Sequence, residues 1–281
     1  MPEYSVGLNP HKNRIPLVRE LTPAIGNSLW ISVMTARIHI GTSGWHYKHW
    51  LGDFYPSEMR PSEMFAFYSQ HFDTVEINNT FYQLPSEKTV DLWRETSPTT
   101  FCFAVKASRF ITHMKKLKDP DSSTKKFFSV VADRLETKLG PILFQLPPGW
   151  LVNIGRLATF LESLPPGYEY VFEFRDESWL TQEVFELLHN HKVALCIHDL
   201  SDLKTPVEVT TEFTYVRFHG PGRAKYTGSY SHEELQRWAG RIESWRRSLS
   251  AIYVYFNNDV GGWAVKNAID LKALLGLQNS T

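Results

Sequence analysis

Ionisable side chains stand at the ends of short apolar runs in this sequence, where folding would bring them together. The candidates for catalysis are Glu76, Lys106, Glu173, His198, Arg217 and His219. Carboxylates and imidazoles transfer protons, while lysine and arginine stabilise negative charge that develops in a transition state. We therefore expect acid–base catalysis in which Glu173 or His219 is the general acid or base, with Lys106 and Arg217 as the positive groups.

Amides, hydroxyls and aromatic rings accompany these ionisable groups and are the candidates for binding a substrate. They are Ser43, Trp45, Asn78, Tyr82, Gln145, Arg175, Trp179, Tyr226, Asn257 and Asn258. Asparagine side chains orient hydroxyls, and the rings of Trp45, Tyr82, Trp179 and Tyr226 are suited to stack on the face of a sugar. The predicted ligand is a small polar molecule, anionic or sugar-like.

A purely structural role is the alternative for the charged groups. Glu76 and Glu173 could form ion pairs with Lys106, Arg175 and Arg217, but burying charges has a high desolvation cost, and an apolar layer would fill the same space. Because so many runs end in polar side chains, we favour a functional site. We expect Arg217 and His219 to be partly hydrated and to matter more for activity than for folding.

A metal site is the second alternative, because Glu76, Glu173, His198 and His219 are ligand types that a divalent metal accepts. The sequence has no close-spaced metal motif. The basic and amide groups can neutralise an anion themselves, so we predict neither an obligatory metal nor a cofactor. A divalent metal stays open.

Short β-branched and aromatic runs alternate with stretches of helical spacing from Arg37 onward. The predicted strands are Arg37–Thr42, Thr74–Ile77, Phe101–Lys106, Pro141–Gln145, Tyr170–Phe174, Val193–His198, Tyr215–His219 and Ile252–Asn257. The predicted helices are Ser62–His71, Glu87–Glu95, Lys125–Lys138, Ile154–Ser163, Gln182–Asn190, His232–Ser248 and Ala264–Leu275. Such alternation indicates parallel strands, and the strand count favours a closed α/β barrel of the (β/α)8 TIM type over an open doubly wound sheet. Leu200–Thr211 lacks a helical pattern.

Alternation within the strands separates two faces. Pairs such as Ile38 with Ile40 and Phe172 with Phe174 are apolar and should face the helices. The other parity turns the polar candidates toward the barrel interior, late in each strand. These positions lie at the carboxyl-terminal face, where barrel enzymes hold their active sites.

Composition excludes several classes of protein. The 281 residues carry 30 Lys+Arg and 30 Asp+Glu, so no net charge attracts nucleic acid or an anionic membrane. Two cysteines are too few for a disulfide framework, and no apolar run approaches the ~20 residues of a membrane span. We expect a cytoplasmic protein with a barrel domain over 37–281, preceded by an N-terminal extension over 1–36 that lacks periodicity.

The loop after the third predicted strand is rich in basic residues. It contains Lys106, Arg109, Lys115, Lys116, Lys118, Lys125 and Lys126. Local positive potential of this kind can attract a phosphate backbone, although a solvated surface explains the later lysines equally well. A nucleic-acid-binding barrel is therefore the second functional hypothesis, and fold-level analogy to endonuclease-type barrels extends it to a phosphodiesterase. A non-catalytic ligand sensor is the third.

Several sequence blocks, taken together, resemble the YecE-like family, also called domain of unknown function 72. They are GTSGW (Gly41–Trp45), YKHWLGDFYP (Tyr47–Pro56), VEINNTFY (Val75–Tyr82), FQLPP (Phe144–Pro148), FEFRDESW (Phe172–Trp179), RFHG (Arg217–Gly220) and YFNND (Tyr255–Asp259). The resemblance runs from Arg37 to Leu275 and implies a (β/α)8 barrel shared with sugar isomerases and endonuclease-type barrels. It implies no particular reaction, because fold alone does not carry function.

Overall fold

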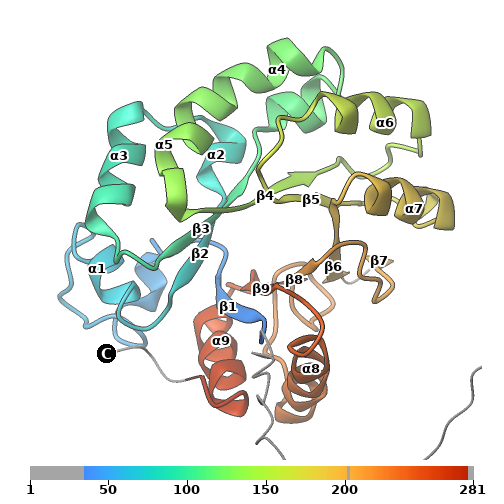
Figure 1. Cartoon of the computed structure of the whole chain (residues 1–281). Coiled ribbons are helices and arrows are strands. Elements are labelled where there is room, and N and C mark those ends of the chain that lie inside the picture. Colours follow the sequence, from blue (N-terminus) through green and yellow to red (C-terminus); the bar gives the residue numbers. More distant parts are fainter. Residues whose placement is uncertain (1–34, 201–202, 278–281) are drawn as a thin grey trace, which may run out of the picture. The chain divides into compact units, whose positions relative to one another are not determined.

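A ring of parallel strands forms the centre of the computed structural model, which describes residues 35–200 and 203–277 (Figure 1). In order around the ring the strands are β1 (Arg37–Thr42), β9 (Ala251–Phe256), β8 (Phe213–Phe218), β6 (Ala194–Leu200), β5 (Tyr170–Glu173), β4 (Leu139–Gln145), β3 (Cys102–Lys106) and β2 (Thr74–Ile77). A parallel bridge between Ser43 and Glu76 brings the two ends of this order together. The predicted eight-stranded α/β barrel is confirmed, and it is nearly closed.

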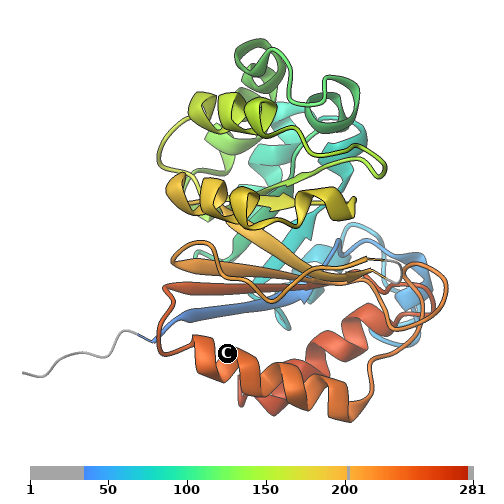
Figure 2. The same cartoon turned by 90° about the vertical axis from the view of Figure 1, so that its right-hand side faces the viewer.

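Helices lie outside the ring of strands (Figure 2). They are α1 (Met64–Tyr68), α2 (Asn79–Tyr82), α3 (Glu87–Thr96), α4 (Pro120–Phe127), α5 (Asp133–Leu135), α6 (Ile154–Ser163), α7 (Gln182–Asn190), α8 (His232–Trp245) and α9 (Trp263–Leu274). The starts of the longer helices follow capping chemistry, as at α8, where Ser231 and Glu234 form a reciprocal capping box. The sequence predicts α6 and α7 with these same bounds, whereas the predicted helix over Lys125–Lys138 is divided by a π-helical turn, Phe128–Ala132.

The connection from β6 to β8 contains no helix among the residues described, as the missing helical pattern over Leu200–Thr211 predicts. Instead, β7 (Leu203–Lys204) pairs antiparallel with the end of β6. The Thr205 hydroxyl accepts a hydrogen bond from the His198 backbone N–H at 2.7 Å. This short return fixes the upper end of β6, which carries His198 and Asp199.

Strand parity separates the two apolar layers as the sequence predicts. Outward-facing residues such as Phe144, Phe172 and Val216 belong to the layer between strands and helices. The barrel interior is filled separately, with small or aromatic side chains at its lower levels, among them Ala104, Val171, Cys196, Tyr215 and Tyr255. Polar side chains occupy the levels above, toward the carboxyl ends of the strands.

The predicted N-terminal extension, 1–36, lies outside the described residues apart from its last two positions. In the described part of the chain, none of the helices combines the length and the apolar character needed to cross a membrane.

Candidate functional site

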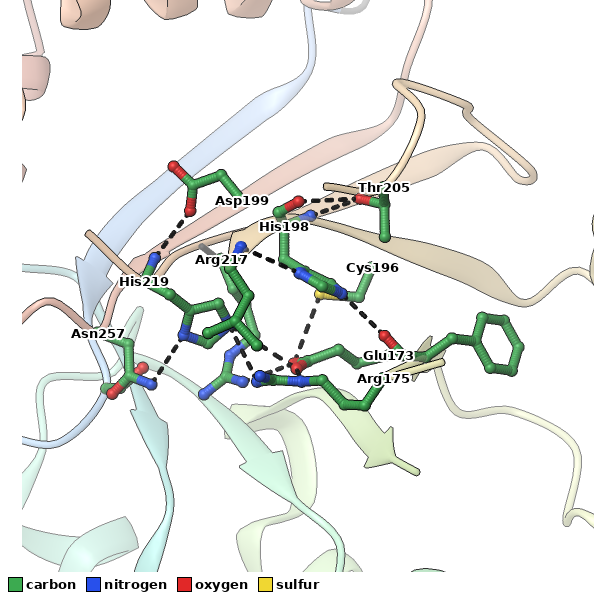
Figure 3. Close-up of polar contacts among 12 residues, drawn as sticks. Glu173, Arg175, Cys196, His198, Asp199, Thr205, Arg217, His219 and Asn257 are labelled. Carbon is green, nitrogen blue, oxygen red and sulfur yellow. Dashed lines mark hydrogen bonds and ion pairs between the residues drawn. The ribbon is translucent and has the colours of Figure 1, made fainter. Parts of the chain in front are cut away.

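A buried arginine joins two buried glutamates in the barrel interior. Arg217 on β8 donates to Glu76 on β2 at 2.8 Å and to Glu173 on β5 at 2.5 Å. Glu76 also accepts hydrogen bonds from Ser43 and from Tyr215, both at 2.6 Å. Figure 3 draws Arg217 and Glu173 among these polar contacts; β6 lies between their strands, β8 and β5. We call Arg217, Glu76 and Glu173 with their donors the glutamate–arginine network.

Burial in this network is complete, which corrects the expectation of partial hydration for Arg217 and His219. Arg217 is 1% exposed, His219 is 1% exposed, and both glutamates are 0% exposed. Burial alone would raise the pKa of each glutamate, but the arginines and the hydrogen bonds outweigh it, so both pKa values lie below the ordinary range. The glutamates are therefore held as anions, and Arg217 as their shared cation.

Arg175, His219 and Asn257 form the next level toward the mouth of the barrel. Arg175 donates from Nε to Glu173 and lies 3.1 Å from His219 Nε2 through Nη2. Because arginine can only donate, Nε2 accepts, and a neutral imidazole then carries its proton on Nδ1. Nδ1 lies 3.2 Å from Nδ2 of Asn257, and exchanging the amide oxygen and nitrogen of Asn257 lets Oδ1 accept the hydrogen bond from Nδ1–H.

Burial keeps His219 neutral. Desolvation lowers its pKa well below the ordinary value, the nearby Glu173 opposes this, and Arg217 adds to the lowering. The Glu173 carboxylate lies 3.7 Å from Nε2, beyond hydrogen-bond range, so the direct partner is Arg175. The His219 ring thus contacts Arg175 on one side and Asn257 on the other, and it is hard to protonate.

Lys106, at the end of β3, differs from the other cations of the interior. It is 9% exposed, and its ammonium stands 4.1 Å above the centre of the Phe81 ring. In the part of the chain that the structure describes, no carboxylate or carbonyl accepts a hydrogen bond from this nitrogen. Desolvation, together with Arg217, lowers the pKa of Lys106 to about 7, although Glu173 and Glu76 pull the pKa upward.

His113 also packs against the Phe81 ring and was not among the sequence candidates. It belongs to a π-helical turn, Phe110–Met114, in the loop after β3, and its ring lies 4.9 Å from that of Phe81. Burial, Lys106 and Arg109 lower its pKa to about 4. A π turn often marks a functional site. The available signal was a histidine seven residues beyond an inward-facing lysine, but a loop has no periodicity to show where its side chain points.

His198 is held by the backbone through both ring nitrogens. Nε2 lies 2.9 Å from the Phe174 carbonyl, and Nδ1 accepts from the Leu200 N–H at 3.4 Å. The residue is 3% exposed, and burial lowers its pKa. These contacts tie the end of β5 to the end of β6 and leave the imidazole neutral.

The structure brings several of the predicted binding residues to this region. Ser43 holds Glu76, Asn257 holds His219, and the Tyr226 ring lies 5.6 Å from that of His219. Gln145 is half-buried and pairs in register with Glu173. Tyr82 is 68% exposed, with the guanidinium of Arg109 5.9 Å from its ring centre.

Asn78, also predicted to bind substrate, follows Ile77 at the end of β2. Its side-chain oxygen is buried and has no hydrogen-bond partner in the described residues, and the same is true of the Nε atom of Arg217. Buried polar atoms are rarely left unpaired. Both atoms keep unused hydrogen-bonding capacity within the described residues.

Two other predicted binding residues, Trp45 and Trp179, pack against neighbouring side chains. The Trp45 ring packs against Phe65 and Trp93, which belong to the surrounding helices. Trp179 is 0% exposed and stacks on the outward-facing Phe174, so it presents no surface to a ligand.

Asn258 is fully buried and fastens a loop. Its amide donates to the Gly228 carbonyl and to Asn267, both at 2.9 Å. The same loop returns over the barrel from Gly220, where φ is +99° and an added Cβ would lie 2.2 Å from the Thr227 carbonyl oxygen. The loop therefore has a fixed path, and it carries Tyr226 to the mouth.

Metal-ligating side chains do not converge in the described residues: no group of three or more His, Cys, Asp or Glu has the arrangement to hold a metal ion. Arg217 and Arg175 occupy the space between the carboxylates instead.

Comparison with known proteins identifies similar chains. Residues 39–281 match the family model described as "Protein of unknown function DUF72". The UPF0759 protein YunF of Bacillus subtilis is 27% identical over 279 residues, covering 86% of this chain and 96% of YunF. The UPF0759 protein YecE of Escherichia coli is 31% identical over 141 residues, which span 49% of this chain and 48% of YecE.

Two crystal structures of similar chains support the architecture. A DUF72 family protein from Thermotoga maritima is 31% identical, with a TM-score of 0.77 over 85% of this chain and 99% of that one. A DUF72 family protein from Enterococcus faecalis is 20% identical, with a TM-score of 0.74 over 86% of this chain and 97% of that one.

Proposed function

This chain belongs to the DUF72 family, and from that premise we propose that it is an enzyme acting on a small polar substrate, anionic or sugar-like, at the carboxyl-terminal face of its barrel. The reaction proceeds by acid–base catalysis with Lys106 as the proton-transfer group. The observation that carries the proposal is a buried lysine that has no counter-ion within 35–200 and 203–277 and lies beside the glutamate–arginine network.

Saturation of the two carboxylates supports this choice of Lys106 over Glu173. The oxygens of Glu76 contact Ser43, Tyr215 and Arg217. Those of Glu173 contact Arg175 and Arg217. A carboxylate with a strongly lowered pKa is a poor base at neutral pH, whereas an amine with a pKa of about 7 exchanges protons there.

Charge balance supports an anionic or strongly polar substrate. Two glutamates and two arginines in the interior cancel, so a protonated Lys106 leaves one uncompensated positive charge. An anion bound beside Lys106 would compensate it and raise its pKa. Arg109 and Tyr82 are exposed near the Lys106 site and can contact the outer part of a ligand.

A ligand screen with matched variants tests the proposal. Wild type, Lys106→Met and the exposed control Lys126→Met are screened by thermal shift against sugar phosphates, sugar acids and free sugars. We expect some compound to stabilise wild type and the control but not Lys106→Met, and to be converted with a rate that titrates near pH 7. The proposal is contradicted if no compound stabilises wild type more than Lys106→Met. Binding without conversion supports the non-catalytic sensor instead.

Nucleic-acid binding is a second candidate, favoured by exposed apolar side chains within the basic loop after β3. Phe110 is 40% exposed and Met114 is 70% exposed, and exposed Arg109, Lys116 and Lys118 surround them in sequence. Titration of labelled single- and double-stranded DNA and RNA at two salt concentrations tests this role. Tight binding that falls steeply with salt supports it, and weak, salt-insensitive binding removes it.

A further inference from the structure

We propose that Lys106 is a nucleophile that forms a Schiff base with its substrate, and that the substrate is therefore an aldehyde or a ketone. This inference rests on the proposed function, since it uses the same site and turns the proton-transfer role of Lys106 into a covalent one. It is carried by the placement of the amine at the end of β3, buried against an aromatic face and without an acceptor among the described residues.

Burial and the neighbouring arginines favour the neutral form of Lys106. Desolvation lowers its pKa most, and Arg217 on β8 and Arg175 beyond β5 also oppose protonation, although the Phe81 face attracts an ammonium. Glu76 on β2 and Glu173 on β5 act in the other direction, but their oxygens are already bound to arginines and hydroxyls. The loop after β3 adds only Arg109 and His113, which carry no negative charge.

Neutral amines attack carbonyl carbons, and lysines desolvated beside other cations are the usual Schiff-base nucleophiles. The Nζ lone pair forms a bond to the carbonyl carbon while the C=O π electrons move to oxygen. The nitrogen loses a proton and the oxygen gains one, giving a carbinolamine. A second proton, from solvent, then reaches the carbinolamine hydroxyl, the C–O bond breaks and water leaves. The nitrogen lone pair forms the C=N bond, and the resulting protonated Schiff base withdraws electrons from the neighbouring carbon.

Proton transfers during these steps pass through solvent at the mouth of the barrel. His113 packs against the same Phe81 ring as Lys106, but its pKa of about 4 makes it a poor base at neutral pH. The arginines remain available for the anionic or hydroxylated remainder of the substrate.

Reductive trapping on the wild-type chain tests the inference. Glycolaldehyde, a small uncharged carbonyl probe, is incubated with the protein and sodium cyanoborohydride at pH 7, and modified lysines are quantified by peptide mass spectrometry. Hydride from the reductant adds to the C=N carbon, so each trapped site gains the mass of glycolaldehyde less one oxygen. The exposed Lys118 and Lys126 of the same chain are the internal comparison.

Lys106 should be modified at least about tenfold faster than the exposed lysines, because a pKa near 7 leaves about half of its amine neutral while an ordinary lysine is almost fully protonated. Dihydroxyacetone phosphate should be trapped at the same residue, whereas glycerol 3-phosphate, which lacks the carbonyl, should only slow the labelling. Lys106→Arg should abolish the trapped product.

Labelling of Lys106 that is no faster than that of Lys118 and Lys126 overturns the inference. If ligands in the thermal-shift screen still depend on Lys106, the proposed function stands with Lys106 as a proton-transfer group alone. If neither the labelling nor the ligand binding depends on Lys106, both proposals fail.

Discussion

Arg217 and Lys106 are both cations in the interior of one barrel, yet their surroundings are opposite. Arg217 contacts two carboxylates and is almost fully buried between them. Lys106 has an aromatic ring beneath it and no acceptor within the described residues. Burial lowers the pKa of both groups, but Glu173 and Glu76 outweigh burial at Arg217, whereas at Lys106 burial and Arg217 outweigh the two glutamates. The comparison teaches that pairing, more than position along a strand, separates structural charges from reactive ones.

The Lys106 site and the glutamate–arginine network also depend on each other. Arg217 occupies the glutamates that would otherwise neutralise Lys106, so the network that stabilises the barrel also keeps the lysine without a counter-ion. Active sites commonly store unfavourable electrostatics of this kind, at some cost in stability. Substitutions at Arg217 and at Lys106 should therefore change stability in opposite directions.

The largest expected effect is the loss of stability in Arg217→Met. This change leaves two buried glutamates without their cation, and breaking a buried ion pair costs about 3–5 kcal/mol. The free energy of unfolding should be measured by urea titration beside Phe218→Ala, a cavity variant of the same strand. We expect the two losses to be similar. A loss under about 1 kcal/mol would show that the pair is partly hydrated, as the sequence predicted.

A smaller effect of opposite sign is expected for Lys106→Met. Because the folded pKa of about 7 lies below the ordinary 10.5, the unfolded chain binds the lysine proton more tightly, and this site makes stability rise with pH between about 7 and 10.5. The penalty is fully present below pH 7. Removing the amine should therefore stabilise the protein by roughly 2–4 kcal/mol at pH 7 and by less at pH 10, at about 1.4 kcal/mol per pKa unit.

Thermal melts of wild type and Lys106→Met at pH 7 and pH 10 measure this difference, with Lys126→Met as the exposed control. A Lys106→Met variant less stable than wild type at pH 7 would place the lysine among the paired, structural charges.

The smallest effect is expected for His198→Leu. The variant loses the contacts with the Phe174 carbonyl and the Leu200 N–H, and leaving such buried groups unsatisfied costs about 1–3 kcal/mol. The rate of glycolaldehyde labelling at Lys106 should not change. Slower labelling of Lys106 in a folded His198→Leu variant would support the catalytic role that the sequence predicted for His198.

The sequence predicts the barrel and the direction of its interior side chains because both follow from local periodicity. Alternation along β2, β5 and β8 was enough to turn Glu76, Glu173 and Arg217 inward. Alternation does not tell how deep in the barrel a side chain lies, since side chains alternate in the same way at the mouth and in the middle of a barrel. Hence the hydration of Arg217 and His219 was predicted wrongly.

Residues beyond the strand ends show where sequence reasoning stops. The aromatic character of Trp45 and Trp179 suggested sugar stacking, but loop geometry packs Trp45 against helix residues and Trp179 against Trp150 and Phe174. The position of His113 seven residues after Lys106 was too weak a signal, because a π-helical turn has no hydrophobic pattern to show where its side chains point. Such placements depend on tertiary contacts that a single sequence does not specify.

The most direct measurement of the central claim is the titration of Lys106 itself. Nuclear magnetic resonance of the folded wild type, labelled with 13C at lysine Cε and assigned with Lys106→Arg, follows the ionisation of this one amine. A midpoint near pH 7 is predicted, because the amine is buried over Phe81 without a counter-ion. A midpoint near the ordinary 10.5 would show that Lys106 is hydrated or paired, and would contradict the account.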